Sequence, residues 1–455
     1  MSNANLFDDF NPVSAKEWKQ KIQFDLKGAD YNKTLVWESP EGIKVKPFYH
    51  SDDKVTPVDV KSSTGWGIGQ SIYVGNATTA NKKVKSVLEK GAEAICLIIP
   101  SEEIKILEVL DGIDLAQTSI YLELQFLNSK YVKSIIDFAQ DAQDNFYINI
   151  DLIGNLAQTG NWFFNLKKDH EVLNEILSLK AKNMLGVDVS LYQNAGGNIV
   201  QQLAYAIAHA NEYLNHCNKK KIQFGVITFK VSVGTNYFFE IAKLRALRLL
   251  WKTLSAEYDV SEDCHIITVP TRRNKTLYDY NTNMLRTTTE CMSAVLGGSD
   301  MVCNMPYDGI YHKNNDFGER ISLNQLLLLK NESYFDKVTN AADGAYYIES
   351  LTHQLAEKAL QLFKSIEKSG GFLKQLKEHT IQRKIQESAI KEQKAFDEGH
   401  EVLVGTNKYQ NENDKMKETI ELYPFLKTNT RKTLIQPILE KRLAEEVEQK
   451  RLDDE

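Results

Sequence analysis

The chain has 455 residues, of which 42% are hydrophobic and 25% are charged, and its formal net charge is −6. This is an ordinary globular composition with enough apolar residues for a large core. Acidic and basic residues are mixed along the sequence, which argues against nucleic acid as a partner because phosphate binding requires a basic field. The sequence has neither the long apolar run of a membrane span nor a secretory signal at its polar start, so we expect no membrane association.

The five cysteines indicate a reducing compartment, and we therefore expect a cytoplasmic protein. They are scattered, odd in number and never spaced as C-x-x-C, so the sequence predicts neither a disulfide framework nor a metal site. Cys96 and Cys303 lie in apolar, strand-like runs and are expected in the core.

Three segments follow one another along the chain. Residues 1–62 are expected to form an extended N-terminal arm that contacts another subunit, with prolines such as Pro40 and Pro47 interrupting regular structure. Residues 63–370 alternate between β-rich runs and amphipathic helices with a repeat of roughly 30 to 40 residues, the size of a βα unit. Residues 371–455 are typical of a helical tail. Apolar strands are predicted at Ala94–Ile99, Ser119–Phe126, Phe146–Ile153, Leu185–Tyr192, Gln223–Lys230, His265–Thr271 and Met301–Pro306.

The alternation predicts a parallel sheet covered by helices, the clearest of which are expected over 236–251, 279–296 and 346–368. About seven consecutive units favour a closed (β/α)₈ barrel over an open doubly wound sheet, which usually has a glycine-rich first turn. The run G-W-G-I-G at Gly65–Gly69 is expected to be a flexible turn, because it precedes a strand instead of linking a strand to a helix.

The tail predicts two amphipathic helices. One has an apolar stripe from Leu376 to Phe396 and is expected to end at Gly399, and the other places apolar residues four apart from Leu439 to Val447. Each stripe needs a surface to cover it, which is either the barrel of this chain or a partner chain.

Five blocks of sequence occur in an order found in one known family. The blocks are 35–43 (LVWESPEGI) with 45–47 (VKP), 236–251, 283–292 (NMLRTTTECM), 345–359, and 404–409 with 442–445. Together they resemble the methylmalonyl-CoA mutase family, from about Leu35 to the C-terminus. The resemblance implies a (β/α)₈ barrel from an enzyme that interconverts methylmalonyl-CoA and succinyl-CoA by radical chemistry. It also implies that coenzyme A lies along the barrel axis, and that adenosylcobalamin caps the barrel from a separate flavodoxin-like domain.

The chain departs from that family at the substrate site. Catalytic chains of the family carry a Gly-Tyr-His run on a barrel strand, and its histidine hydrogen-bonds the thioester carbonyl of the substrate. The matching stretch here keeps Tyr192 but lacks the histidine, so that Gln193 follows. A histidine can polarise a carbonyl near neutral pH, whereas Gln193 can only donate a neutral hydrogen bond. Tyr192 either lines a pocket or fills space in the barrel.

The motif for the lower ligand of cobalamin, Asp-x-His-x-x-Gly, is also missing. The nearest match is Asp263-Cys264-His265, which lacks the glycine and lies where a strand is predicted to begin. Because the tail ends at Glu455, we expect no cobalamin domain in this chain. We therefore expect that this chain binds no cofactor and that adenosylcobalamin is held by a partner.

Two further charges are candidates for contact with substrate. Arg272 and Arg273 follow the strand predicted at His265–Thr271, and the carboxyl ends of barrel strands form the active face. They either meet a phosphate there or lie in a loop that faces solvent.

These observations favour a small, non-catalytic subunit of a heterodimeric methylmalonyl-CoA mutase, whose large (alpha) subunit holds acyl-CoA and cobalamin. Two alternatives stay open: a catalytic acyl-CoA mutase barrel that uses a separate cobalamin-binding protein, and an unrelated barrel that acts as a binding protein. The barrel axis discriminates between them, because bulky side chains there favour a structural subunit and a channel of small polar ones favours coenzyme A binding. The expected partner contacts in the arm are Trp37, Pro40, Pro47, Phe48 and Tyr49.

Overall fold

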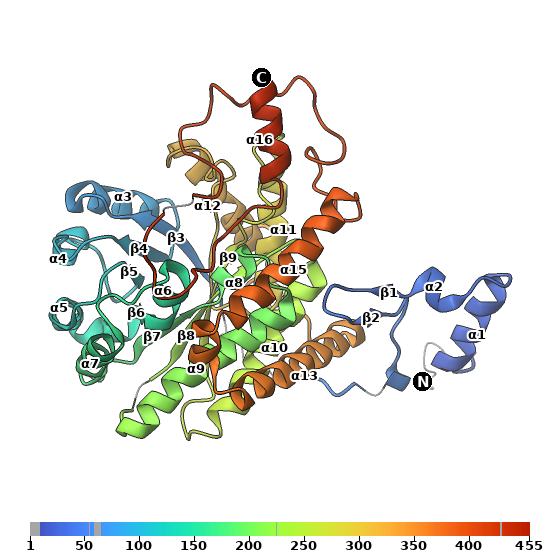
Figure 1. Ribbon diagram of the computed structural model, residues 1–455, viewed down its shortest axis with the longest axis horizontal. Helices are drawn as coiled ribbons and strands as arrows, with labels where there is room; N and C mark the ends of the chain where they lie inside the picture. The colour runs from blue at the N-terminus through green and yellow to red at the C-terminus, as the bar shows by residue number, and fades with distance from the viewer. Residues whose placement is uncertain (1–9, 54, 59–64, 224, 428–429) are drawn as a thin grey trace, which may run out of the picture.

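A computed structural model of the protein describes residues 10–53, 55–58, 65–223, 225–427 and 430–455. Within these ranges eight parallel strands close into a barrel in the order β10-β3-β4-β5-β6-β7-β8-β9, which confirms the predicted (β/α)₈ barrel (Figure 1). The strands are β3 (Gly67–Tyr73), β4 (Ala94–Ile99), β5 (Ser119–Leu124), β6 (Phe146–Ile150), β7 (Asn183–Asp188), β8 (Ile227–Val233), β9 (Cys264–Pro270) and β10 (Met301–Cys303).

Helices surround the barrel and shield the outer face of its strands. The barrel helices are α3 (Ala77–Glu89), α4 (Ile106–Val109), α5 (Ser129–Ala139), α6 (Leu152–Thr159), α7 (Leu166–Leu177), α8 (Ser190–Asn194), α9 (Ile199–Lys220), α10 (Tyr237–Ser255), α11 (Thr282–Leu296), α12 (Asp316–Asn331) and α13 (Tyr346–Lys368). No helix among the described residues is apolar over a length that would cross a bilayer.

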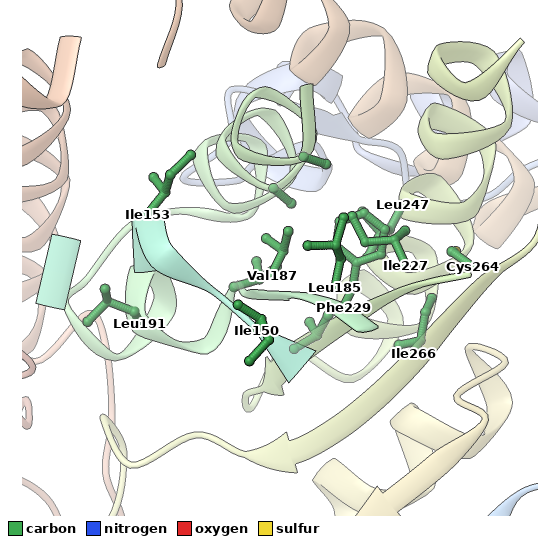
Figure 2. Packing of buried hydrophobic residues seen from close by; sticks show 14 of the residues in the cluster. Ile150, Ile153, Leu185, Val187, Leu191, Ile227, Phe229, Leu247, Cys264 and Ile266 are labelled. Atoms are coloured by element: carbon green, nitrogen blue, oxygen red, sulfur yellow. The ribbon is translucent and has the colours of Figure 1, made fainter. Parts of the chain in front are cut away.

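Alternate residues of each strand point to opposite faces, and the outward set forms the main core. Figure 2 shows part of this core, where Leu185, Ile227 and Phe229 gather near Leu247 of α10. The burial of these apolar side chains between strands and helices is the main driving force for the fold.

The arm is more regular than expected. It contains α1 (Ala15–Asp25), α2 (Tyr31–Leu35) and a hairpin of β1 (Trp37–Glu38) and β2 (Lys44–Val45), so the prediction that it lacks regular elements is wrong. The prolines lie outside the two helices, and Ser14 caps α1 through a capping box with Glu17. The arm extends away from the barrel (Figure 1).

The strand predicted at Leu185–Tyr192 is too long. Strand β7 ends at Asp188, whose carboxylate accepts a hydrogen bond from the backbone N–H of Ser190 at 2.9 Å and turns the chain into α8. Tyr192 therefore lies on a short helix after the strand.

The flexible turn expected at Gly65–Gly69 is also wrong, because Gly67–Gly69 opens strand β3. A Cβ atom on Gly69 would lie 2.3 Å from the sulfur of Met301, so this strand position has no room for a side chain. Gly69 therefore reflects close packing and not flexibility.

The tail forms more helices than predicted. The single helix expected to run from Leu376 to Phe396 is divided into α14 (Phe372–Lys377) and α15 (Thr380–Asp397), because His379 adopts a left-handed conformation with φ of 59°. The last helix, α16 (Glu445–Asp454), begins after Leu439 and Leu443, so these two residues precede it.

Candidate functional site at the carboxyl end of the barrel

Side chains that point inward from β4, β5, β9 and β10 fill the axis of the barrel. Ile95 and Leu97 of β4 belong to the outer core, so Cys96 between them points inward. There it packs in a separate buried cluster, and the sulfur of Met301 occupies the space above Gly69. The predicted burial of Cys96 and Cys303 is confirmed. The cluster consists of Ala94, Cys96, Tyr121, Ile267, Met301 and Cys303, with Tyr147 and Val269 packed against it.

His265 belongs to this interior. Its Nε2 atom lies 2.9 Å from the hydroxyl of Tyr121, and its ring packs against those of Tyr121 and Tyr147 with centroid distances of 5.6 and 4.4 Å. Burial lowers the pKa of the His265 imidazole, and the nearby carboxylate of Asp300 opposes that shift.

The cobalamin implied by the family resemblance does not fit this histidine. An imidazole that packs against two tyrosine rings within the barrel cannot ligate a cobalt ion held outside it. Across the described ranges, no group of three or more His, Cys, Asp or Glu side chains is arranged to hold a metal ion.

Three charged side chains lie above this cluster, where the strands end. The ammonium of Lys230 on β8 lies 2.6 Å from Glu123 on β5 and 3.5 Å from Asp188 on β7. Between 26 and 40% of each side chain is exposed, so the mouth of the barrel is open to solvent.

This arrangement keeps Lys230 protonated. Burial opposes the positive charge, but the carboxylates of Asp188 and Glu123 outweigh burial and raise the pKa of Lys230 above its ordinary value. A lysine in this state serves neither as a base nor as a nucleophile near neutral pH. Its charge is also compensated by its neighbours, which leaves little positive field for a carboxylate or phosphate.

Tyr192, a candidate for substrate contact, points away from this mouth. Its hydroxyl lies 3.0 Å from Nδ1 of His209, whose Nε2 lies 2.8 Å from the carboxylate of Asp151. The Tyr192 ring packs against Tyr205 of α9 and Phe372 of α14. Tyr192 is fully buried and thus joins the barrel to the tail.

Gln193 is likewise engaged by its own chain. Its amide nitrogen donates to Glu240 at 3.2 Å, and its amide oxygen accepts from Lys243 at 3.0 Å. Lys243 also donates to Gln202 and to the carbonyl of Ser232, so these groups form one buried network. The Gln193 amide fastens α8 to α10 and is not available to a ligand.

The two arginines have different positions. Arg273 is buried, and it donates to Glu392 of α15 at 2.5 Å and to the carbonyl of Lys441 at 2.7 Å. Arg272 is exposed. Burial raises the pKa of the Glu440 carboxyl group, and the positive charge of Arg272 opposes that shift. Only Arg272 of the four substrate-facing candidates therefore presents its side chain to solvent.

A segment of the tail crosses the carboxyl ends of β6 to β9. This segment from Leu434 to Leu443, which we call the strap, runs across α6 and α8 (Figure 1). Its backbone N–H groups donate to the carbonyls of Gly160, Ala157, Asn194 and Arg273 at 2.8–3.2 Å. The tail thus lies on the barrel of its own chain at this face.

The arm candidates lie partly against the barrel. Trp37 is 49% exposed and packs on Phe239, with ring centroids 5.8 Å apart. The ring centroid of Tyr49 lies 5.0 Å from that of Tyr347 on α13, and the ring centroid of Phe48 lies 6.4 Å from that of Trp18 on α1. Pro40 and Pro47 are exposed.

Sequence reasoning missed Glu123, Asp188 and Lys230. The available signal was a charged residue at an inward position of three apolar strand runs. The sequence alone does not show that these three residues meet, because β5 is not a neighbour of β7 or β8 in the barrel. Their proximity can be recognised only once the strand order and the closure of the barrel are known.

These features define a class: a (β/α)₈-barrel protein with a filled axis and mutually paired charges at its mouth. The sequence profile of the family described as methylmalonyl-CoA mutase matches residues 101–453. The chain belongs to the methylmalonyl-CoA mutase family, a family of isomerases.

Three relatives illustrate the similarity. The chain is 33% identical to a "Methylmalonyl-CoA mutase small subunit" of Porphyromonas gingivalis, over 89% of this chain and 71% of that one. It is 28% identical to a methylmalonyl-CoA mutase of Rhizobium meliloti, over 90% of this chain and 65% of the relative. It is 26% identical to the mitochondrial enzyme of Bos taurus, over 93% of this chain and 64% of the relative. The chain thus spans about two thirds of the length of these relatives.

Proposed function

We propose that this chain is the small subunit of an adenosylcobalamin-dependent methylmalonyl-CoA mutase and has a structural role. A large subunit would bind acyl-CoA and cobalamin and would interconvert methylmalonyl-CoA and succinyl-CoA. The similarity to a small subunit of Porphyromonas gingivalis supports this proposal.

The filled barrel axis is the observation that carries the structural role. A coenzyme A arm that lies along the axis needs a channel, and here Tyr121, Ile267 and Met301 are at most 4% exposed within it. Protein interiors are close-packed, so an arm of that width would have to displace several of these side chains. The alternative of a catalytic barrel with a separate cobalamin protein is disfavoured for the same reason.

The chemistry of the mouth agrees with a role that is not catalytic. Gln193 follows Tyr192 where catalytic chains of the family carry a histidine, and its amide is held by Glu240 and Lys243. Lys230, a cation at the mouth of the barrel, is paired with two carboxylates. Neither group is free to polarise a thioester carbonyl.

The surface of the arm supports a partner chain. Helix α1 has no buried residue, and Trp18 and Phe24 are 50 and 78% exposed. Apolar side chains that share one exposed helix are typical of a protein–protein contact. We infer that α1 packs on the large subunit together with Trp37, Pro40, Pro47, Phe48 and Tyr49.

A cytoplasmic location is part of the proposal. All five cysteines are buried and unpaired in the structure. Thiols persist in this state in a reducing compartment.

The decisive experiment compares the isolated chain with a reconstituted complex. The purified chain should neither retain adenosylcobalamin in gel filtration nor turn over methylmalonyl-CoA, and activity should appear when a large subunit with the cobalamin motif is added. Turnover by the isolated chain with added cobalamin would refute the proposal.

A matched pair of variants tests the arm. Trp18→Ala should weaken association with the large subunit at least tenfold in analytical ultracentrifugation, because truncation of a central interface aromatic often has an effect of this order. Phe164→Ala is the control, since Phe164 is similarly exposed at 60% but belongs to the barrel. Equal effects of the two variants would contradict the assigned contact.

A further inference from the structure

Two histidines that take no part in the barrel mouth lie side by side on neighbouring helices. His170 of α7 and His216 of α9 have ring centroids 4.9 Å apart, with their planes inclined at 58°. Both residues are partly exposed, so a small ion from solvent can reach them. They are distant in the sequence and meet because α7 and α9 follow adjacent barrel strands, β6 and β7.

One hydrogen bond fixes which nitrogen of each ring carries a proton. Nδ1 of His170 lies 2.7 Å from the carbonyl oxygen of Leu166 on the same helix, and Nε2 of His216 lies 2.7 Å from the amide oxygen of Asn174. Because these oxygens can only accept, each of the two nitrogens donates. The neutral rings therefore keep one unprotonated nitrogen each, Nε2 of His170 and Nδ1 of His216. Neither of these has a hydrogen-bond partner in the part of the chain that the structure describes.

This is the state in which imidazoles bind transition metals. A metal-bound histidine typically donates its second N–H to a carbonyl, a carboxylate or water, which fixes the tautomer and the orientation of the ring. Leu166 and Asn174 supply such acceptors here. His170 and Asn174 are four residues apart on α7, so one ring and the acceptor for the other share a face of this helix.

The separation of the two rings fits one shared ion. An imidazole nitrogen binds Zn²⁺ at about 2.0–2.1 Å, which places the ring centroid about 3.2 Å from the ion. Two such rings at a bond angle of about 90–109° have centroids about 4.5–5.2 Å apart. The observed 4.9 Å lies within this range. Trp162 packs edge-on against the ring of His170, with centroids 5.8 Å apart, and restricts its movement.

We propose that His170 and His216 together bind one divalent transition-metal ion, Zn²⁺ or Cu²⁺, with water completing its coordination. Imidazole nitrogens favour these ions over Mg²⁺ and Ca²⁺, which prefer oxygen ligands. Two protein ligands leave coordination positions open, so the ion is exchangeable. The bound ion joins α7 to α9 on the outer side of the barrel, and the site does not depend on the role of the chain in a mutase.

Protonation of the rings competes with the metal, and the surroundings of His216 disfavour it. Burial, together with His170 and the charges of Lys220 and Lys219, lowers the pKa of the His216 imidazole. The ring is therefore neutral at pH 7 and able to act as a ligand. Both lysines are exposed, so solvent and salt screen their repulsion of a bound cation.

Quenching of tryptophan fluorescence by Cu²⁺ tests the site. The full chain, free of any histidine tag, is titrated with CuCl₂ at pH 7, and the bound ion should quench Trp162 beside His170. Trp162→Phe should lose most of this quenching but keep the Cu²⁺ affinity measured by calorimetry. Zn²⁺ should bind more weakly than Cu²⁺, following the general order of affinities, and Mg²⁺ should not bind.

Matched variants connect binding to the two rings. His170→Ala and His216→Ala should each weaken Cu²⁺ binding at least tenfold, whereas His400→Ala, at a side chain that is 77% exposed in the tail, should leave it unchanged. Asn174→Ala keeps both imidazoles but removes the acceptor for His216, and should weaken binding about tenfold. Unfolding midpoints without metal check that each variant folds. Zn²⁺ should raise the midpoint of the parent chain but not that of either ring variant.

Three results would overturn the assignment. The absence of saturable Cu²⁺ binding would mean that the two unprotonated nitrogens do not share an ion. Equal losses of affinity in His400→Ala and His170→Ala would mean that Cu²⁺ binds surface histidines without preference. Full affinity in a folded His216→Ala variant would place the ion elsewhere on the chain.

Discussion

Replacing Tyr192 by Phe separates a structural role for this residue from contact with substrate. The carboxylate of Asp151 accepts from Tyr213 and from two backbone N–H groups, in addition to its contact with His209. Burial opposes the negative charge of Asp151, but His209 and these donors outweigh it and lower its pKa, so it is an acceptor. His209 must then donate through Nε2, which leaves Nδ1 to accept from the Tyr192 hydroxyl.

The magnitude follows from what Tyr192→Phe leaves behind. The ring still packs on Phe372, but Nδ1 of the fully buried His209 loses its donor. An unsatisfied buried acceptor costs about 1–3 kcal/mol, and we expect a loss of about 2 kcal/mol in the free energy of unfolding. Since the hydroxyl lies outside the barrel mouth, the kcat of the reconstituted complex should not change.

Urea unfolding of the isolated chain measures this loss as a lower midpoint with an unchanged slope. Tyr205→Phe is the matched control, because Tyr205 is buried beside Tyr192 and its hydroxyl makes no hydrogen bond within the described part of the chain. The control should change stability by less than about 0.5 kcal/mol. The reasoning fails if both variants are equally stable, or if Tyr192→Phe keeps its stability and lowers kcat.

Three further predictions test the packed axis, the strap and a buried charge. Gly69→Ala should destabilise the chain by about 1–3 kcal/mol through overpacking against Met301, and the double variant Gly69→Ala/Met301→Ala should recover part of that loss in urea unfolding; no recovery would place the clash elsewhere. Gly160→Ala, at a position with φ of 80° where a Cβ would lie 2.7 Å from the strap backbone, should accelerate limited proteolysis within the strap, and an unchanged cleavage pattern would contradict that contact. Burial opposes ionisation of Asp300, but Arg248 outweighs it and lowers the pKa of Asp300 below 3.8, so its contribution to stability is present above that pH and is lost as the pH falls through the lowered pKa. Asp300→Asn should therefore be less stable than the parent chain at pH 7 and approach it below pH 3.8 in acid titrations of unfolding; a constant difference would refute this linkage.

The barrel could be predicted from the sequence because its signals are local. A buried strand is a short apolar run and a barrel helix has an apolar stripe, so each element is readable within a window of its own length. Helix α13 was predicted over 346–368 and is found at Tyr346–Lys368. The two predictions that failed near the site concern places where distant contacts decide the backbone. The sulfur of Met301 sets the space at Gly69, and an Asp188 hydrogen bond ends β7 before Tyr192.

The sequence by itself determined the fold class, the likeness to the mutase family, and the missing histidine after Tyr192, since each depends only on the order of residues. Only the tertiary structure decided what the candidate side chains touch. Arg273 meets Glu392 across 119 residues, and Lys230 meets Glu123 across 107 residues. No local pattern encodes such pairs, because closing the barrel and laying the tail on it brings them together. For the same reason the filled axis, on which the proposed structural role rests, is a property of inward side chains from several strands at once.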